Sequence, residues 1–469
     1  MSIRQSLVLR RCGVVWALGA LAWAGAAPAQ ERAAPAMPAP AMLAPALAEP
    51  AAMAQAAGAR ALTLAQVLAA ARDSSAVLQA RAALSAAQAD IKSADHAPLP
   101  VFTGKSSSMD LQHGLGSGSL LGQKRIDKSL ELDWTWERGN KRALRTEAAQ
   151  RSADAAQSDV HEVQTQQLQA ALAAYFELLA AQERLHETQA IEHSAQELAR
   201  LAERRLQAGD LAAQDVQRTR IEAERAHTDT QAATLAYEQA AVALVQIIGR
   251  NAGLGAGAAL SASASDWPAA PATADTALPP ALRADLDALV EDRSDVRAAL
   301  SRLRAAQAAL ALANAQRKSD WTLGASYDHW PGTSNRLVEL RIQMPLQWGY
   351  HYEGEIGRAQ AMEEQAQELL DDTRRQARLD LQNLQQTALR AAQRVASFER
   401  GILPRAREVA QSAEFAYAKG ALPLTDLLDA RRTLRATLLD AVTARADYAK
   451  ALGAWQLRVQ PQALLGPQP

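Results

Sequence analysis

The chain has 469 residues, 48% of them hydrophobic, and its 50 basic and 51 acidic side chains give a net charge of −1. Because these charges are dispersed along the chain, the sequence has no basic block of the kind that binds nucleic acid. The single cysteine, Cys12, excludes an intramolecular disulfide.

Residues 1–29 have the pattern of a secretory signal peptide, because three arginines precede an apolar run over residues 12–27. Residues 30–60 are mostly alanine and proline, a composition that cannot bury a core, and we interpret them as a flexible leader. Beyond the signal, no apolar run reaches about 18 residues, so no transmembrane helix is expected. The mature chain is expected to be exported.

The rest of the chain is an internal duplication with a period of about 210 residues. The segment LSAAQA at 84–89 recurs as LRAAQA at 303–308. A second match keeps its internal spacing: Gly209, Leu211 and Asp215 recur as Gly420, Leu422 and Asp426. We therefore predict a first repeat at 61–250 and a second repeat at 282–460. A linker at 251–281 joins them, and a tail follows at 461–469.

Each repeat is predicted to contain a helix, two strands, a very long helical stretch, a glycine turn and a returning helix. The long stretches match in length, since Gly209 comes 70 residues after Gly139 and Gly420 comes 71 after Gly349. At 1.5 Å per residue each spans about 105 Å, which implies coiled-coil packing. Pro404 is expected to kink or break the second stretch.

Four segments alternate apolar and polar residues over about ten positions, as membrane strands do. In the second of them the apolar residues take the even positions from Leu130 to Trp136, and Glu131, Asp133 and Thr135 lie between them. In the fourth, the alternation extends from Val338 to Trp348. The strands are expected near 101–112, 126–137, 320–330 and 337–348.

The first of these segments is the weakest, because Lys105 and Ser107 fall on the face that is expected to be apolar, and it is retained by the symmetry of the repeats. Tryptophans near the segments resemble the aromatic girdle of membrane barrels: Trp134, Trp136, Trp321, Trp330 and Trp348. A soluble sheet would show the same alternation, but its helices would fold against it. These helices are too long for a compact domain.

Four strands cannot stand alone in lipid, because a sheet with open edges leaves backbone groups unpaired there. Bacterial barrels begin at about eight strands, so at least two copies are required, and three copies give about twelve strands. A cyclic assembly of that kind also closes the helices into a tube.

The sequence resembles the TolC family of outer-membrane efflux proteins from Leu62 to about Val459. The matching segments are LTL at 62–64, AYFELL at 174–179, LQAG at 206–209, MPL at 344–346, AYAKG at 416–420 and LLDA at 427–430. The resemblance implies a mainly α protein with membrane β structure. Its long helical hairpins would form a periplasmic α-barrel, and four strands per protomer would enter a shared twelve-stranded transmembrane β-barrel.

The resemblance also implies a homotrimer in the outer membrane with a long periplasmic extension. Its partners would be outer-membrane lipid, a periplasmic adaptor (a membrane fusion protein) and an inner-membrane transporter such as a resistance-nodulation-division pump. The chain would serve an efflux or type I secretion system as a passive exit duct. Adaptor docking is expected at the hairpin turns, which contain Gly209, Leu211, Gly420 and Leu422.

Carboxylates cluster at the two turns, which are expected at the periplasmic mouth: Asp210, Asp215, Asp426 and Asp429. Repeated by symmetry, they would ring the mouth with negative charge and favour cations. The alternative is that Asp215 and Asp426 only complement helix N-termini. Family members hold carboxylates at the positions of Asp426 and Asp429, and Tyr417 matches a gate tyrosine. A basic latch residue of one member corresponds to Leu422 here.

Catalytic motifs are incomplete in this sequence, and no cofactor or metal is expected. Two His-Glu pairs, at 161–162 and 186–187, lack the second histidine of a zinc-protease helix. The rival interpretation is a periplasmic coiled-coil adaptor or scaffold protein, which would also be exported. Such a protein needs only one long hairpin, and this chain has two.

Overall fold

The computed structural model describes residues 61–109, 112–119, 125–249, 260–269, 282, 285–460 and 464, which belong to one compact unit. The expected signal peptide, the leader, most of the linker and nearly all of the tail lie outside these residues. Within the described part, no helix combines the length and the apolar character needed to cross a membrane.

The first repeat follows the predicted order of elements. It starts with a capping box, in which the Thr63 hydroxyl accepts the Gln66 N–H and the Gln66 side chain accepts the Thr63 N–H. Its elements are β1 (Ala61–Leu62), α2 (Leu64–Ala71), α3 (Ser75–Ala94), β2 (Val101–Ser107), β3 (Asp127–Trp136), α4 (Lys141–Gln207) and α5 (Ala213–Ile248).

The second repeat has the same order, after β4 (Ser261–Ala262) and η2 (Ala264–Asp266) of the linker. Its elements are α6 (Leu286–Asp292), α7 (Ser294–Ala315), β5 (Trp321–Trp330), β6 (Ser334–Gln343), α8 (Glu353–Ser397), η4 (Phe398–Ile402), α9 (Leu403–Ala418) and α10 (Leu424–Val459).

The long stretch of the second repeat is interrupted, whereas α4 is one helix of 67 residues. A single π-helical turn, η4, separates α8 from α9, and Pro404 lies in the first turn of α9. Proline has no N–H, and its ring crowds the carbonyl four residues earlier, so an α-helix cannot continue unchanged through it. The expected kink or break is confirmed as a π-helical turn just before Pro404.

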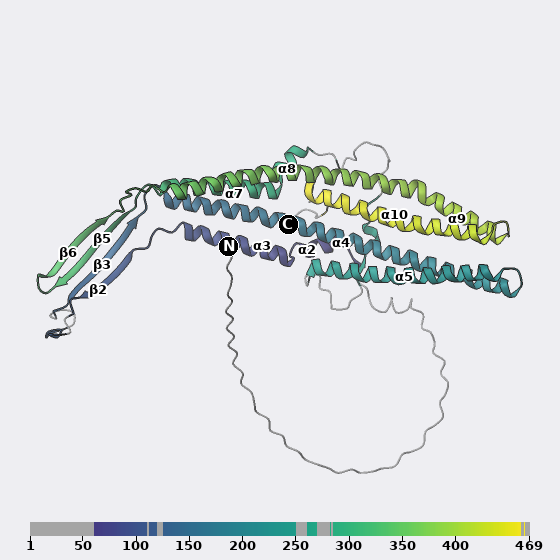
Figure 1. Ribbon diagram of the computed structural model, residues 1–469, viewed down its shortest axis with the longest axis horizontal. Coiled ribbons are helices and arrows are strands. Elements are labelled where there is room, and N and C mark those ends of the chain that lie inside the picture. The colour runs from purple at the N-terminus through teal and green to yellow at the C-terminus, as the bar shows by residue number, and fades with distance from the viewer. Residues whose placement is uncertain are drawn as a thin grey trace, which may run out of the picture. The chain divides into compact units, whose positions relative to one another are not determined.

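The elements pack side by side in a row four elements wide (Figure 1). The sheet has the order β2-β3-β5-β6. The helices next to it follow the order α3-α4-α7-α8, and those next to the glycine turns follow α5-α4-α10-α9. One margin of the row therefore consists of β2, α3 and α5, and the other consists of β6, α8 and α9.

Small residues let the two central helices approach closely. A Cβ added to Gly453 of α10 would lie 2.4 Å from Cδ1 of Leu172 on α4. The linker is fixed to α4 nearby, because the buried Tyr175 hydroxyl contacts the Leu62 carbonyl at 3.0 Å and the Asp266 carboxylate at 2.5 Å. Burial raises the pKa of Tyr175, so it stays a neutral donor. Both repeats and the linker thus share one core.

The glycine turns end α4 and α9 in the same way. Gly209 and Gly420 have φ of +80° and +75°. In each turn, the glycine N–H and the next N–H bond carbonyls of the last helical turn, with lengths of 3.0 and 2.8 Å after α4 and 3.0 and 2.9 Å after α9. This is the Schellman arrangement, which requires a left-handed residue.

Alanine at either glycine is expected to destabilise the protein by about 1 kcal/mol, because an L-residue is strained at these φ values. Urea unfolding of Gly209→Ala and Gly420→Ala measures the change. Gly357→Ala is the matched control, since Gly357 lies inside α8 with open space around its Cα. The control should be neutral or slightly stabilising. Equal stability of all three variants would contradict the assignment of strain.

Candidate functional site

The four-stranded sheet has one apolar face and one charged face, and both are built by antiparallel pairing. Lys128 and His329, which are paired with each other, end the apolar face on the side away from the helices. Its exposed large side chains are Phe102, Leu130, Leu132, Trp134, Trp136, Leu323, Tyr327, Val338, Leu340 and Ile342. Exposing so much apolar surface to water would cost free energy, and the face has the composition of a lipid-facing surface.

The expectation for the first strand was wrong about its faces. Phe102 pairs with Leu132, so Phe102 belongs to the apolar face, while Lys105 pairs with Ser129 and lies on the charged face. Ser107 pairs with Asp127, also on that face. A shift of one residue exchanges the two faces of a strand, so the apparent misfit of Lys105 and Ser107 disappears in the observed register.

The expected fourth strand also ends too late, since β6 stops at Gln343. Pro345 has no N–H for the ladder. Trp348 therefore lies beyond the strand, where it is 89% exposed. Of the other four tryptophans singled out, Trp134, Trp136 and Trp321 lie in the part of β3 and β5 next to the helices, and Trp330 ends β5 at the opposite side.

The charged face is organised around Gly324, whose importance the sequence reading missed. Arg341 of β6 reaches across Gly324 of β5 to form ion pairs with Asp133, at 2.6 Å, and with Glu131 on β3. A Cβ on Gly324 would lie 2.4 Å from the Asp133 carboxylate and 3.2 Å from Nε of Arg341. A glycine inside a strand, flanked across the sheet by opposite charges, is the signal that could have identified this contact.

Gly324→Ala is expected to displace Arg341 and destabilise the sheet by about 1–3 kcal/mol, as overpacking does. Gly104→Ala is the matched control, because a Cβ at that strand position would lie 3.9 Å from Leu130, an ordinary contact. Urea unfolding in detergent compares the two variants. Equal midpoints for both would contradict the role given to Gly324.

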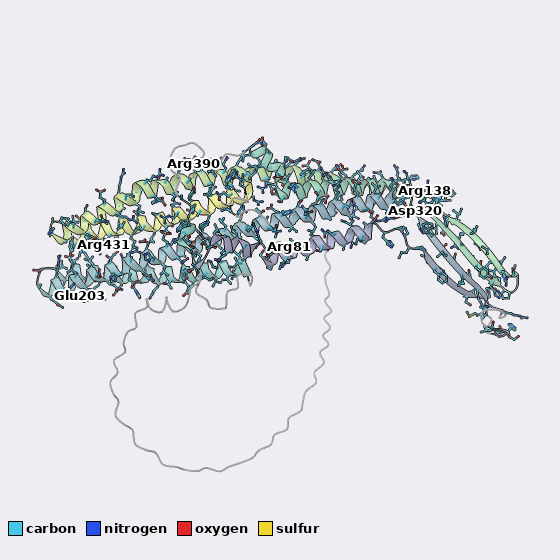
Figure 2. All side chains as sticks on the ribbon, turned by 180° about the vertical axis from the view of Figure 1, so that it is seen from behind. Arg81, Arg138, Glu203, Asp320, Arg390 and Arg431 are labelled. Atoms are coloured by element: carbon cyan, nitrogen blue, oxygen red, sulfur yellow. The ribbon has the colours of Figure 1, made fainter. Side chains whose placement is uncertain are left out.

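Polar and aromatic contacts fix the junction between the sheet and the helices (Figure 2). The Asp320 carboxylate accepts hydrogen bonds from the Arg138 N–H at 2.8 Å and from Nζ of the buried Lys141 at 2.9 Å. The Trp136 and Trp321 rings meet edge to face at 6.0 Å, and the Arg138 guanidinium lies 4.7 Å from the Trp321 ring. These contacts attach the sheet to the ends of the helices.

The acidic residues at the turns occupy two kinds of position. Asp215 and Asp426 lie in the first turns of α5 and α10, where a carboxylate complements the exposed N–H groups. Asp215 also lies 3.4 Å from Arg218. Asp210, next to the turn glycine, and Asp429, one turn further along α10, are exposed.

Tyr417, expected at the gate, is buried between the two hairpins. It packs with Leu198 of α4 and with Leu424, Leu427 and Leu428 of α10, and Leu422 contacts the same cluster. The Arg205 guanidinium of α4 lies 5.2 Å from the Tyr417 ring. In one copy of the chain, Tyr417 thus joins the hairpins, while Leu211 at the other turn is half-buried.

Basic residues of α10 face acidic residues of α4 and α5 along its whole length, a pattern that the sequence reading missed. Arg458 binds Glu162 of α4 at 2.7 and 2.8 Å, and both side chains are nearly buried. The other pairs are Lys450 with Glu177, Arg445 with Glu183, Arg435 with Asp229 and Arg432 with Glu222. Ion pairs therefore set how the second repeat lies against the first.

Glu222→Gln is expected to lower stability by about 0.5 kcal/mol at pH 7, because Arg432 is half-exposed and solvent screens the pair. The hydrogen bond from Arg432 holds the pKa of the Glu222 carboxyl below its ordinary value. The stability that the ionised Glu222 adds is therefore present above an ordinary carboxyl pKa of about 4.3. It is lost as the pH falls through the lowered pKa.

Thermal melting at pH 7 and at pH 3 compares this variant with Glu238→Gln, an exposed control on the same helix. A difference from the native protein that is equally large at both pH values would contradict the ion pair.

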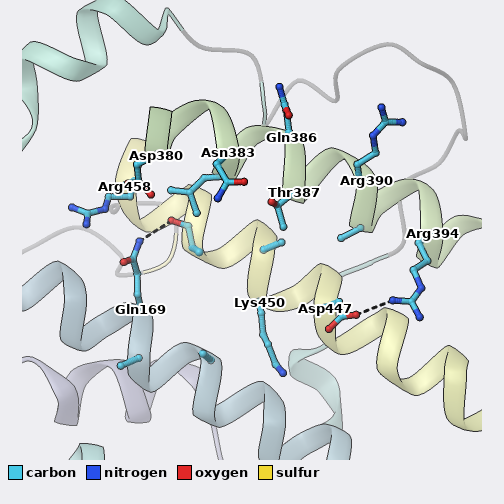
Figure 3. Close-up of a pocket in the computed structure, with 16 residues that line it drawn as sticks. Gln169, Asp380, Asn383, Gln386, Thr387, Arg390, Arg394, Asp447, Lys450 and Arg458 are labelled. Carbon is cyan, nitrogen blue, oxygen red and sulfur yellow. Dashed lines mark hydrogen bonds and ion pairs between the residues drawn. The ribbon is translucent and has the colours of Figure 1, made fainter. Parts of the chain in front are cut away.

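A groove of about 910 Å³ lies between α4, α8 and α10 (Figure 3). Its charged lining is largely paired: Arg394 binds Asp447 at 3.0 Å, and Lys450 and Arg458 bind the glutamates of α4 described above. Gln169 donates to the Ala454 carbonyl at 3.3 Å. This lining offers amide and paired charged groups rather than a nucleophile with its base. Among the described residues, no three His, Cys, Asp or Glu side chains gather as metal ligands.

The first repeat matches a known family. A model of the family described as "Outer membrane efflux protein" matches residues 66–250. No protein of curated function matches the chain by sequence.

Solved structures extend this likeness over most of the chain. The outer-membrane channel OprN is 22% identical with a TM-score of 0.68, covering 86% of this chain and 90% of OprN. The outer membrane protein VceC of Vibrio cholerae is 18% identical with a TM-score of 0.66, covering 86% and 96%. The outer membrane channel MtrE of Neisseria gonorrhoeae, in its open state, is 17% identical with a TM-score of 0.62, covering 84% and 88%.

The chain therefore has the fold of these outer-membrane channels over both repeats, as the sequence predicted. The family is one of transport proteins rather than of enzymes. The alternative interpretation, a periplasmic adaptor, is wrong, because the chain contains two long hairpins and a sheet that joins both repeats.

Proposed function

We propose that the chain is one subunit of an outer-membrane channel that serves an efflux pump as a passive exit duct. The observation that carries this proposal is the amphipathic sheet, with ten large apolar side chains exposed on one face and the Arg341 ion pairs on the other. The apolar face suits outer-membrane lipid, and the charged face suits an aqueous interior. We assign the chain no catalytic step and no cofactor.

The assembly that fits this sheet is cyclic. β2 and β6 are the end strands of the sheet, and they run in opposite directions, so β6 of one copy can pair antiparallel with β2 of the next. Three copies, the number that the TolC resemblance implies, would give twelve strands. The helices at the same two margins would close into a tube.

The mouth of this tube would lie at the glycine turns, far from the sheet. There the proposed selectivity residues are Asp210, Asp215, Asp426 and Asp429, with Tyr417 beneath them. A periplasmic adaptor would dock near Gly209, Leu211, Gly420 and Leu422 and connect the channel to an inner-membrane transporter such as a resistance-nodulation-division pump. The tryptophans Trp134, Trp136, Trp321, Trp330 and Trp348 would lie at membrane interfaces.

Fractionation tests the assembly. Heat-resistant oligomers in outer-membrane extracts are the expected result, and monomers in the periplasmic fraction would contradict the channel.

Asp426→Asn combined with Asp429→Asn is expected to reduce the cation preference of the reconstituted channel, because each copy then brings two fewer negative charges to the mouth. Reversal potentials under a salt gradient measure the preference. Asp90→Asn is the control, since Asp90 is an exposed carboxylate on α3 near the sheet. Reversal potentials that do not move would remove the selectivity role from these residues.

A further inference from the structure

The helices α5 and α9 end the row near the turns, and the main packing neighbour of each is one long helix, α4 for α5 and α10 for α9. Both helices leave apolar side chains exposed at positions that are multiples of seven residues apart, which places these side chains on one face of each helix. On α5, Ile221 is 50% and Leu235 is 54% exposed, and the exposed Thr228 lies midway between them. On α9 and the end of η4, Val409 is 55% and Ile402 is 46% exposed.

The face of α5 is also concave. A groove of about 550 Å³ runs beside it, lined by Ile221, Glu224, Arg225 and Thr228 of α5 and by Arg432 and Arg435 of α10. The two arginines of α10 are already held by Glu222 and Asp229. Glu224 forms no ion pair within the described residues, and the same is true of Arg405 on α9.

Residues of α5 and α9 that are equally far from their turn glycines along the chain lie at the same height above the turns. Glu224 comes 15 residues after Gly209, and Arg405 comes 15 before Gly420. Ile221 comes 12 after its glycine and Val409 comes 11 before, while Thr228 comes 19 after and Ile402 comes 18 before. The contact between Arg205 and Tyr417, four and three residues before their glycines, places the two turns at about the same level within one copy.

We infer that α9 of one copy packs antiparallel along α5 of the next, with Val409 against Ile221, Ile402 against Thr228 and an ion pair between Arg405 and Glu224. The inference rests on the proposed cyclic channel and names the contact that closes its periplasmic tube. The two faces differ from each other, so the contact is head to tail and each copy uses both of its margins. The complementary charges fix the register against a slip of seven residues.

Cysteine crosslinking tests the register in the full chain, whose single cysteine, Cys12, falls in the expected signal peptide. Thr228→Cys with Ile402→Cys is expected to give covalent oligomers on denaturing gels after oxidation in membranes, and each single variant should give none. Thr228→Cys with Val409→Cys is the matched control for a slip of one heptad. Crosslinking of the control pair alone would overturn the register.

Heat-resistant oligomers that crosslink at neither pair would overturn the α5–α9 contact while leaving the proposed channel in place. Absence of the oligomer itself would be a failure of the proposed function.

Charge exchange tests the ion pair separately. Glu224→Arg is expected to lower the temperature at which the oligomer dissociates, because it places two like charges together. Adding Arg405→Glu should restore it. Glu197→Arg, at an exposed carboxylate on α4 and not on a margin helix, should leave the dissociation temperature unchanged. Failure of the double variant to recover would overturn the Glu224–Arg405 pair, since each chain would still fold with its own contacts.

Discussion

Backbone groups at the edge of a β-sheet need partners wherever the sheet lies in hydrocarbon, and this requirement organises the protein. In one copy, β2 and β6 are edges that pair on one side only. The margins of the helical part lie in line with these edges, because α3 leads into β2 and α8 follows β6. A single head-to-tail contact can therefore satisfy the sheet and the helices together.

Buried apolar clusters hold the row together, and small residues and ion pairs determine how closely and in which position its helices pack. The absence of a side chain at Gly453 lets Leu172 pack against the backbone of α10. The ion pairs of α10 extend from Arg432 to Arg458. An exposed ion pair contributes about 0.2–1 kcal/mol, so most of these pairs add little stability one by one. Their number and direction make them better suited to setting how α10 lies on α4.

The sequence alone was enough to predict the repeats, the order of elements, the interruption near Pro404 and the amphipathic sheet, because each depends on the spacing of residues along the chain. It was not enough for the register of β2, since Val101 and Phe102 are both apolar and either could define the lipid face. The Arg341 ion pairs across Gly324 were missed because they join residues about 200 positions apart. The contacts of Tyr417 with α4 were missed for the same reason: they depend on how the two repeats pack.

The structure also refines the two explanations for the acidic turns, which do not exclude each other. A carboxylate in the first turn of a helix interacts with exposed N–H groups and still keeps its full negative charge. Asp215 and Asp426 lie in such first turns, so their presence has a structural explanation whatever the mouth does. Asp429 is one turn further along α10, where the influence of the helix N-terminus has faded. Glu222 raises the pKa of Arg432, and the charge of Asp429 adds a smaller effect in the same direction. Asp429 is therefore the residue that separates a role in selectivity from a role in helix stability.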